Sequence, residues 1–143
     1  MIAIELSKPV RSAGDDQKGW VPALTFNVLI QPDRSIGEIT LRLGNTKWIT
    51  HYAGHVGYHI DPNHQGLGYA TQACLLLRPI AVGEGFSELW ITCNPDNWPS
   101  RKVCEKIGAE LVEIVDLPAG NDMYEEGDRQ KCRYHWVLSE QIL

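Results

Sequence analysis

The sequence predicts a single α/β domain over residues 1–143, a mixed β-sheet with helices packed on it. Apolar residues alternate with other residues in much of the first 60 positions and again near the C-terminus, a period of two that is typical of strands. Between these regions the apolar residues recur every three or four positions, the period of a helix with one buried face. A length of 143 residues and an apolar fraction of 43% are ordinary for one globular domain.

Four strands are expected first. Residues 2–6, 24–30 and 39–43 carry apolar side chains at every second position, and residues 55–60 look like a fourth strand. Residues 12–19, which are rich in Gly and Asp, form a loop that is too short for a pair of helices. No helix is therefore expected between the first two strands.

A helix is expected from Gly68 to about Val82. Pro79 lies inside it, where proline removes one main-chain hydrogen bond and crowds the carbonyl of Leu75, so a kink or an early end is expected. The apolar face of this helix consists of Ala70, Ala73, Cys74, Leu77 and Ala81.

A second helix is expected to begin near Pro99 and to end before Gly108, because proline is favoured in the first turn of a helix and glycine just after the last. The predicted order is four strands, a helix, a strand, a helix and two strands. The three later strands cover residues 89–93, 111–115 and 131–138.

The composition excludes several classes of protein. The net charge is −5, from 13 Lys and Arg against 18 Asp and Glu, and no basic block appears, so no nucleic-acid partner is expected. No apolar run reaches the roughly 18 residues of a membrane span, and the N-terminus lacks the features of a signal peptide. The four cysteines include no Cys-x-x-Cys pair and the histidines lack ligand spacing. Reduced thiols, no metal, no membrane partner and a cytoplasmic location are therefore expected.

A turn with two glycines, Gly66 and Gly68, joins the fourth predicted strand to the first helix. The first turn of a helix has unpaired N–H groups and a partial positive charge, and glycines let a phosphate approach the main chain. No Lys follows as in a P-loop, and the third glycine of the dinucleotide fingerprint is absent. The residues alone leave two interpretations open, a phosphate-binding turn and an ordinary tight turn.

Two segments resemble signatures of the GNAT acetyltransferase superfamily. Residues 65–70 read Gln-x-x-Gly-x-Ala, which is similar to the pyrophosphate loop Q/R-x-x-G-x-G/A of that superfamily. Residues 97–109 read Asn-x-x-Ser and then Glu-Lys-x-Gly-Ala, which resembles its second signature. The resemblance covers about residues 37–138 and implies a GNAT-like fold, with the sheet splayed between its fourth and fifth strands. GNAT proteins usually have two helices between the first two strands, so this chain resembles a short member that lacks them.

The resemblance also implies a cofactor, acetyl-CoA, in the gap of the splayed sheet. The main chain of Tyr58, His59 and Ile60 would pair with the pantetheine arm as an added strand does. Asn97 matches a position that commonly meets the pantetheine, although it could also cap the second helix. Ser100, one turn into that helix, is either a second contact or an exposed surface residue. The pyrophosphate loop would comprise Gln65, Gly66, Leu67, Gly68, Tyr69, Ala70 and Thr71.

The implied reaction is direct transfer of an acetyl group from the thioester to a primary amine of a small molecule or a peptide. Such a transfer needs a base for the amine proton and an acid for the leaving thiolate. Two other interpretations stay open. One is a non-catalytic module that binds acyl-CoA as a sensor or interaction domain, and the other is an α/β protein that binds a nucleotide at the same turn.

The acid and the base depart from the common GNAT pattern. Many members have a tyrosine acid where this chain has Cys104, and some have a carboxylate base where it has Thr92. His55 is a candidate base, and Tyr134 and Cys104 are candidate acids, although a structural role competes with each of the three assignments. Two further candidates are Tyr124 and Glu38.

The acceptor side is expected to be open, or closed by a second subunit in a homodimer, because the two usual helices are missing. Residues 118–130 could form part of the remaining wall. Their carboxylates would attract a cationic amine, unless the segment is simply a solvated hairpin loop. These carboxylates belong to Asp122, Glu125, Glu126 and Asp128.

Overall fold

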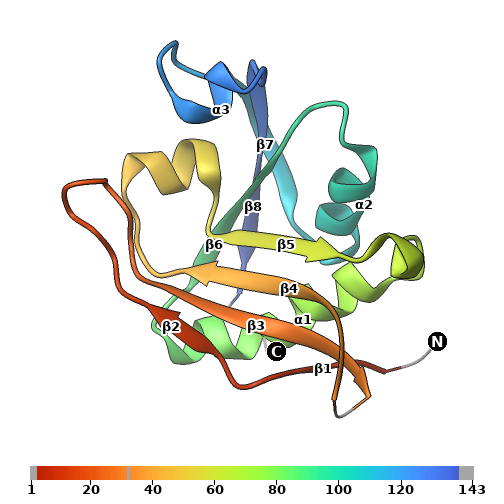
Figure 1. The fold of residues 1–143 in the computed structure, drawn as a ribbon. Helices are drawn as coiled ribbons and strands as arrows, with labels where there is room; N and C mark the ends of the chain where they lie inside the picture. Colours follow the sequence, from red (N-terminus) through yellow and green to blue (C-terminus); the bar gives the residue numbers. More distant parts are fainter. Residues whose placement is uncertain (1–2, 32, 139–143) are drawn as a thin grey trace, which may run out of the picture.

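Two antiparallel sheets form the framework of the computed structural model, which describes residues 3–31 and 33–138 (Figure 1). The first sheet has the order β1-β3-β4-β5, with β2 paired to β3, and the second has the order β6-β8-β7. Residue 2 of the first predicted strand lies outside the described ranges. The strands are β1 (Glu5–Leu6), β2 (Val10–Ser12), β3 (Ala23–Gln31), β4 (Arg34–Arg42), β5 (Val56–Ile60), β6 (Glu88–Cys93), β7 (Glu110–Asp116) and β8 (Gln130–Val137).

The first sheet follows from the alternation in its sequence. On β3, Phe26 and Val28 are buried, whereas Asn27 between them is exposed. Ile39 on β4 lies opposite Phe26 and is fully buried. Each such side chain stabilises the fold by roughly 1.5–3 kcal/mol when it leaves water. Together they form the apolar face on which α1 (Tyr69–Gly83) packs.

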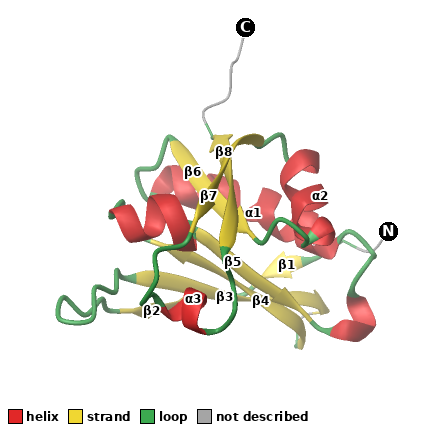
Figure 2. Cartoon of the chain, turned by 90° about the horizontal axis from the view of Figure 1, so that it is seen from above, coloured by secondary structure: helices red, strands yellow, loops and turns green. Residues whose placement is uncertain are grey.

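The two sheets separate between β5 and β6, as the GNAT resemblance implies. Just before β5, the N–H of His55 donates to the carbonyl of Trp90 on β6 at 2.7 Å, but β5 and β6 form no ladder of paired residues. Figure 2 shows the two groups of strands diverging from this point. The divergence leaves one edge of β5 without a partner strand.

Helix α1 runs through Pro79 to Gly83, so of the two expected effects of Pro79, a kink or an early end, the early end was wrong. Pro79 is exposed, whereas Leu77 and Ala81 on either side of it are fully buried in the core. Packing of this buried face holds the helix together across the missing hydrogen bond, because tertiary contacts override local propensity.

Helix α2 (Trp98–Lys106) has the predicted proline in its first turn and the predicted glycine after its end. Gly108 adopts a left-handed conformation with φ of 91°, and Ala109 donates back to the carbonyl of Cys104 at 2.9 Å. The helix packs against β6 and α1, with Cys104 turned into the core.

Three short helical segments were not predicted. They are a π-helix at Trp48–Ala53, a 3-10 helix at Pro62–His64 and α3 at Asp122–Glu125. Each has six residues or fewer, which is too short to produce a recognisable apolar period. Between β1 and β3 the described residues contain the short strand β2 and no helix, as the sequence predicts.

Among the described residues, no helix combines the length and the apolar character needed to cross a membrane.

Candidate functional site

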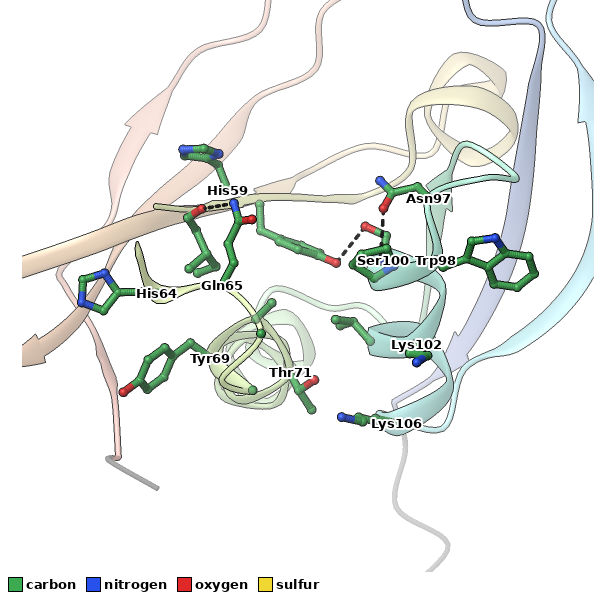
Figure 3. A pocket seen from close by; sticks show the side chains of 17 residues that line it. His59, His64, Gln65, Tyr69, Thr71, Asn97, Trp98, Ser100, Lys102 and Lys106 are labelled. Atoms are coloured by element: carbon green, nitrogen blue, oxygen red, sulfur yellow. Dashed lines mark hydrogen bonds between the residues drawn. The ribbon is translucent and has the colours of Figure 1, made fainter. Parts of the chain in front are cut away.

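A cavity of about 630 Å³ opens where the end of β5, the start of α1 and the exposed side of α2 meet (Figure 3). It brings together both signature segments, which are some 30 positions apart in the sequence. Of the twelve residues predicted to bind the cofactor, all except Leu67 line it. The lining residues are Tyr58, His59, Ile60, His64, Gln65, Gly66, Gly68, Tyr69, Ala70, Thr71, Asn97, Trp98, Pro99, Ser100, Lys102, Val103 and Lys106.

The glycine turn leaves a row of main-chain donors at the start of α1. Gly66 and Gly68 have φ of 77° and 86°, left-handed values that favour glycine, and Gly68 is the residue that precedes the helix. The first N–H to bond back is that of Gln72, to the carbonyl of Gly68 at 3.1 Å. Within the described ranges, the N–H groups of residues 66–71 have no hydrogen-bond partner. An anion of suitable size can accept from such a cluster.

The free edge of β5 forms another side of the cavity. On its paired edge, Arg42 donates to the carbonyl of His55 and Asp61 donates to that of Ile36. Main-chain groups of an antiparallel strand alternate between its two edges. His59 therefore bonds β4, while the main chain of Tyr58 and Ile60 faces the unpaired edge.

The side chain of Gln65 links the glycine turn to the free edge of β5. Its Nε2 donates to the carbonyl of Ile60 at 2.7 Å, which ties the start of the glycine turn to the last residue of β5. The first residue of the predicted pyrophosphate motif therefore has a positioning contact in this structure.

Helix α2 contributes a capped N-terminus and a hydroxyl. Oδ1 of Asn97 accepts from the N–H of Ser100 at 3.3 Å, so the predicted capping alternative for Asn97 is confirmed. The Ser100 Oγ lies 3.0 Å from the hydroxyl of Tyr58 on β5 (Figure 3). Burial raises the pKa of the Tyr58 phenol above its ordinary value, so the phenol keeps its proton at neutral pH.

Two lysines on α2, Lys102 and Lys106, complete the lining and were missed by the sequence reasoning. They are four residues apart and therefore share one face of the helix. That face also includes Pro99, one turn before Lys102. Lys106 belongs to the second signature, Glu-Lys-x-Gly-Ala, and this signal could have placed it beside the glycine turn.

His55, the predicted base, lies outside the group of residues that line the cavity and is 1% exposed. Its Nδ1 accepts from the N–H of Trp90 at 2.9 Å, so its proton sits on Nε2, which donates to Oδ1 of Asn45 at 2.9 Å. Burial lowers the pKa of this imidazole. With both nitrogens engaged, His55 joins the two sheets, and this arrangement favours the structural alternative.

Tyr134 and Cys104, the predicted acids, are both 1% exposed and are not among the lining residues either. The Tyr134 hydroxyl accepts from Nε of Arg101 at 3.0 Å, which ties β8 to α2. Burial raises the pKa of the Cys104 thiol and that of the Tyr134 phenol. These contacts also favour core roles. All four cysteines are free and buried.

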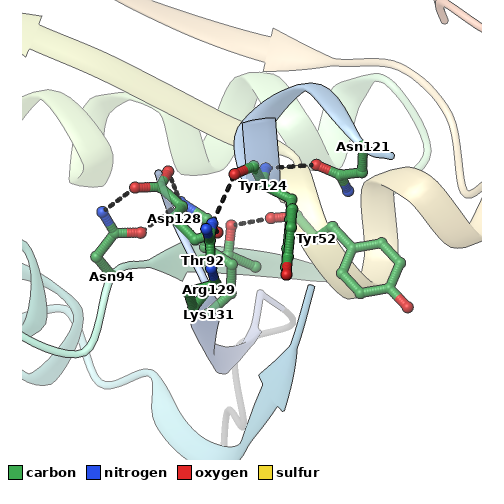
Figure 4. Close-up of polar contacts among 8 residues, drawn as sticks. All are labelled: Tyr52, Thr92, Asn94, Asn121, Tyr124, Asp128, Arg129 and Lys131. Atoms are coloured by element: carbon green, nitrogen blue, oxygen red, sulfur yellow. Dashed lines mark hydrogen bonds and ion pairs between the residues drawn. The ribbon is translucent and has the colours of Figure 1, made fainter. Parts of the chain in front are cut away.

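Residues 118–130 are anchored at Asp128, while the carboxylates of Asp122, Glu125 and Glu126 are exposed. Oδ1 of Asp128 accepts from Nδ2 of Asn94 at 3.0 Å, and Nζ of Lys131 donates to Oδ1 of Asn94 at 2.7 Å (Figure 4). Lys131 also pairs with Asp128 at 3.3 Å, which neutralises one of the four carboxylates predicted to attract an amine. Two positions earlier on β6, Oγ1 of Thr92 donates to the carbonyl of Tyr52 at 2.8 Å and fixes the π-helix beside this segment.

Comparisons with known proteins agree with this geometry. The acetyltransferase (GNAT) domain family matches residues 5–110 of the chain. The chain is 28% identical over 117 residues to YnaD, an uncharacterised N-acetyltransferase of Bacillus subtilis. The match covers 80% of this chain and 63% of YnaD.

Two solved structures show the same fold. One is RimL, a ribosomal L7/L12 α-N-protein acetyltransferase in complex with coenzyme A. Its TM-score is 0.62, its identity to this chain is 18%, and the match covers 85% of this chain and 64% of RimL. The other is MccE, a microcin C7 self-immunity acetyltransferase in complex with acetyl-CoA and AMP, with a TM-score of 0.59 and 20% identity over 86% of this chain and 64% of that chain. With its family match over most of its length and its splayed sheet, the chain belongs to the GNAT acetyltransferase family.

Proposed function

We propose that the chain is an acetyl-CoA-dependent N-acetyltransferase that moves an acetyl group directly to a primary amine of a small molecule or a peptide. The observation that carries this proposal is one cavity with two complementary features. Six main-chain donors at the start of α1 face no protein acceptor in the described ranges, and the unpaired edge of β5 runs toward them.

The residues present fit acetyl-CoA. The N–H groups of residues 66–71 suit a diphosphate, because the dipole of α1 and the exposed donors both favour negative charge. The main chain of Tyr58 and Ile60 suits the amide groups of a pantetheine arm, which would extend the first sheet by one strand. Asn97 and Ser100 line the opposite wall. When bound, acetyl-CoA supplies the activated acetyl group as a thioester.

We assign the acid role to the Tyr58 hydroxyl, positioned by Ser100. As the new C–N bond forms and the C–S bond breaks, the amine gives its proton to water, the leaving thiolate takes the proton of the Tyr58 hydroxyl, and water returns a proton to Tyr58 afterwards. Tyr58 is the one phenol on β5, and its hydroxyl crosses the cavity to α2. We propose core roles for His55, Tyr134 and Cys104.

The test is an acceptor screen that follows free thiol after acetyl-CoA is mixed with a panel of small amines and peptides. An acetylated product, identified by its mass increase, is expected for at least one acceptor class. Calorimetric binding of acetyl-CoA without turnover across the whole panel would support the non-catalytic module instead. Tighter binding of ATP or NAD than of coenzyme A would support the nucleotide-binding alternative.

A further inference from the structure

The cavity holds two positive charges that the proposed diphosphate contacts do not use. We propose that Lys102 and Lys106 form a second anion site, which takes the ribose 3′-phosphate of coenzyme A and so distinguishes it from the 3′-dephospho form. This inference rests on the proposed function, since it places a further group of the same ligand.

The two ammonium groups lie at one end of the cavity. Helix α2 begins beside Tyr58, where Asn97 and Ser100 lie, and continues past the start of α1 to Lys106. Figure 3 shows the Lys106 side chain extending from α2 toward Thr71, with Lys102 between it and Ser100 along the same helix. They are therefore placed next to the predicted diphosphate and at the far end of the cavity from the reacting thioester.

These charges are uncompensated in an acidic protein. The net charge is −5, yet neither lysine forms an ion pair with any carboxylate in the described part of the chain. No Asp or Glu lines this cavity. Two cations one helical turn apart, with no carboxylate in the cavity lining, repel each other and create a local positive potential that favours a dianion.

The chemistry of coenzyme A supplies that anion at a suitable place. Its ribose carries a phosphate monoester next to the diphosphate, with a charge of about −1.5 to −2 at pH 7. The main-chain donors of residues 66–71 are neutral and serve the diphosphate, whereas lysine is a common point-charge partner of phosphate. A ligand whose pantetheine arm follows β5 toward Ser100 therefore leaves its ribose near the two lysines.

The experiment compares coenzyme A with 3′-dephospho-coenzyme A by calorimetry, on the unaltered chain and on K102M/K106M, which keeps most of the aliphatic stems. The unaltered chain is expected to bind coenzyme A at least about tenfold more tightly than the dephospho form. The double variant is expected to bind both forms equally, with the affinity for the dephospho form unchanged. K47M, which alters an exposed lysine away from the cavity, is the matched control and should keep the tenfold preference.

The outcomes of this experiment distinguish a failure of the lysine site from a failure of the proposed function. An equal loss of affinity for both ligands in K102M/K106M would mean that the lysines hold the diphosphate, and it would overturn the proposal. So would an unaltered chain that does not distinguish the two ligands. If the unaltered chain binds neither ligand, the proposed function itself fails. Thermal unfolding of the double variant near the temperature of the unaltered chain shows that any change arises at the site.

Discussion

Two hydroxyls from different elements meet at the cavity, and their 3.0 Å contact is where the proposed chemistry can be probed most directly. Replacing Tyr58 by Phe removes the proton that we assign to the leaving thiolate. We expect kcat to fall about 10- to 100-fold, near the low end of the range for general acid catalysis, while the Kd of coenzyme A changes little. Steady-state kinetics and calorimetry measure the two effects separately.

The matched control is Y52F, which removes a phenol hydroxyl from the π-helix outside the cavity. Because burial raises the pKa of Tyr58, the phenol stays protonated across the neutral range, and its ionisation should cause no alkaline loss of activity below about pH 10. A Y58F enzyme with the kcat of the unaltered chain would remove Tyr58 from the mechanism.

His55 gives a prediction about stability. Its folded pKa is lowered by burial, so the unfolded chain takes up the proton more readily than the folded one. The free energy of unfolding should therefore fall as the pH drops below about 6.5, the ordinary pKa of histidine. In H55A the lost bonds to Asn45 and Trp90 should cost about 2–4 kcal/mol at pH 7.5, and the acid-dependent part should disappear.

Urea unfolding at pH 7.5 and pH 5.5 measures both parts of this prediction. H51A, at a half-buried histidine in the π-helix, is the control and should keep the acid-dependent loss. If the H55A chain stayed as stable as the unaltered chain but lost turnover, the structural assignment of His55 would be wrong and the base assignment would return.

At the residue scale, sequence reasoning named most of the residues that line the cavity but not the long-range contacts of the candidate catalytic side chains. The glycine turn is a local motif, so its residues could be named in advance. The partners of His55 are 10 and 35 positions away, and no local pattern reveals that they occupy both of its nitrogens. For the same reason only the main chain of Tyr58 was considered, since its contact to Ser100 spans 42 positions.

At the scale of the secondary-structure elements, the proposed binding of coenzyme A depends most on the start of α1, where the glycine turn joins the helix. Gly68 precedes the helix with φ of 86°, which a branched side chain resists. We expect G68V to weaken binding of coenzyme A more than tenfold, or roughly 1.4 kcal/mol and above, because the donors of residues 66–71 would lose their common orientation. Calorimetry with coenzyme A measures this loss.

A control for G68V lies at the other end of the same helix. Gly83 has no left-handed φ, and nothing lies within 4 Å of a Cβ built there. G83V should therefore keep the affinity for coenzyme A, apart from a small cost in stability. A folded G68V chain that binds coenzyme A as tightly as G83V does would contradict the diphosphate assignment.

Elements with a long periodic pattern could be predicted, and short ones could not. The alternation of apolar residues predicted β3 and β4, and apolar residues at every third or fourth position predicted α1. Both patterns arise because these segments bury one continuous face. The π-helix and α3 depend on contacts to β6 and to an Asn121 cap instead of on periodicity. At Pro79 the helix does not end, because the packing of Leu77 and Ala81 outweighs one missing hydrogen bond.

On the scale of the whole molecule, the proposed ligand bridges β5 of the first sheet and α2, which packs on the second. Hydrogen exchange followed by mass spectrometry should therefore show slower exchange at residues 66–71 and at Tyr58 when coenzyme A is added. The N–H of His59, which faces β4, should be little affected. At a ligand concentration of 100 times Kd, the free energy of unfolding should rise by about 2.7 kcal/mol.

A reference region within the same molecule is β7, which lines no part of the cavity and should exchange equally with and without the ligand. Slower exchange confined to the small cavity formed by residues 43–45 and 84–86 would place the ligand elsewhere and contradict the arrangement proposed above.

The overall architecture could be predicted because the two signature segments lie in the expected order, and a family resemblance carries the topology that periodicity alone does not. The place where the sheets separate has no signature of its own. It depends on the contact of His55 with Trp90, in which two short bonds join the sheets before they diverge.

The Gln65 side chain has one more consequence for ligand length. It occupies the carbonyl of Ile60, the last acceptor on the open edge of β5. An extended arm lying along this strand can therefore continue its pairing no further than Ile60 and has to turn there toward the start of α1. The amide thus acts as a fixed stop. In the proposed arrangement it sets the distance from the anionic end of the ligand to the Tyr58 hydroxyl, so the acyl carbon of a shorter arm would fall short of the proposed proton donor and that of a longer arm would pass it.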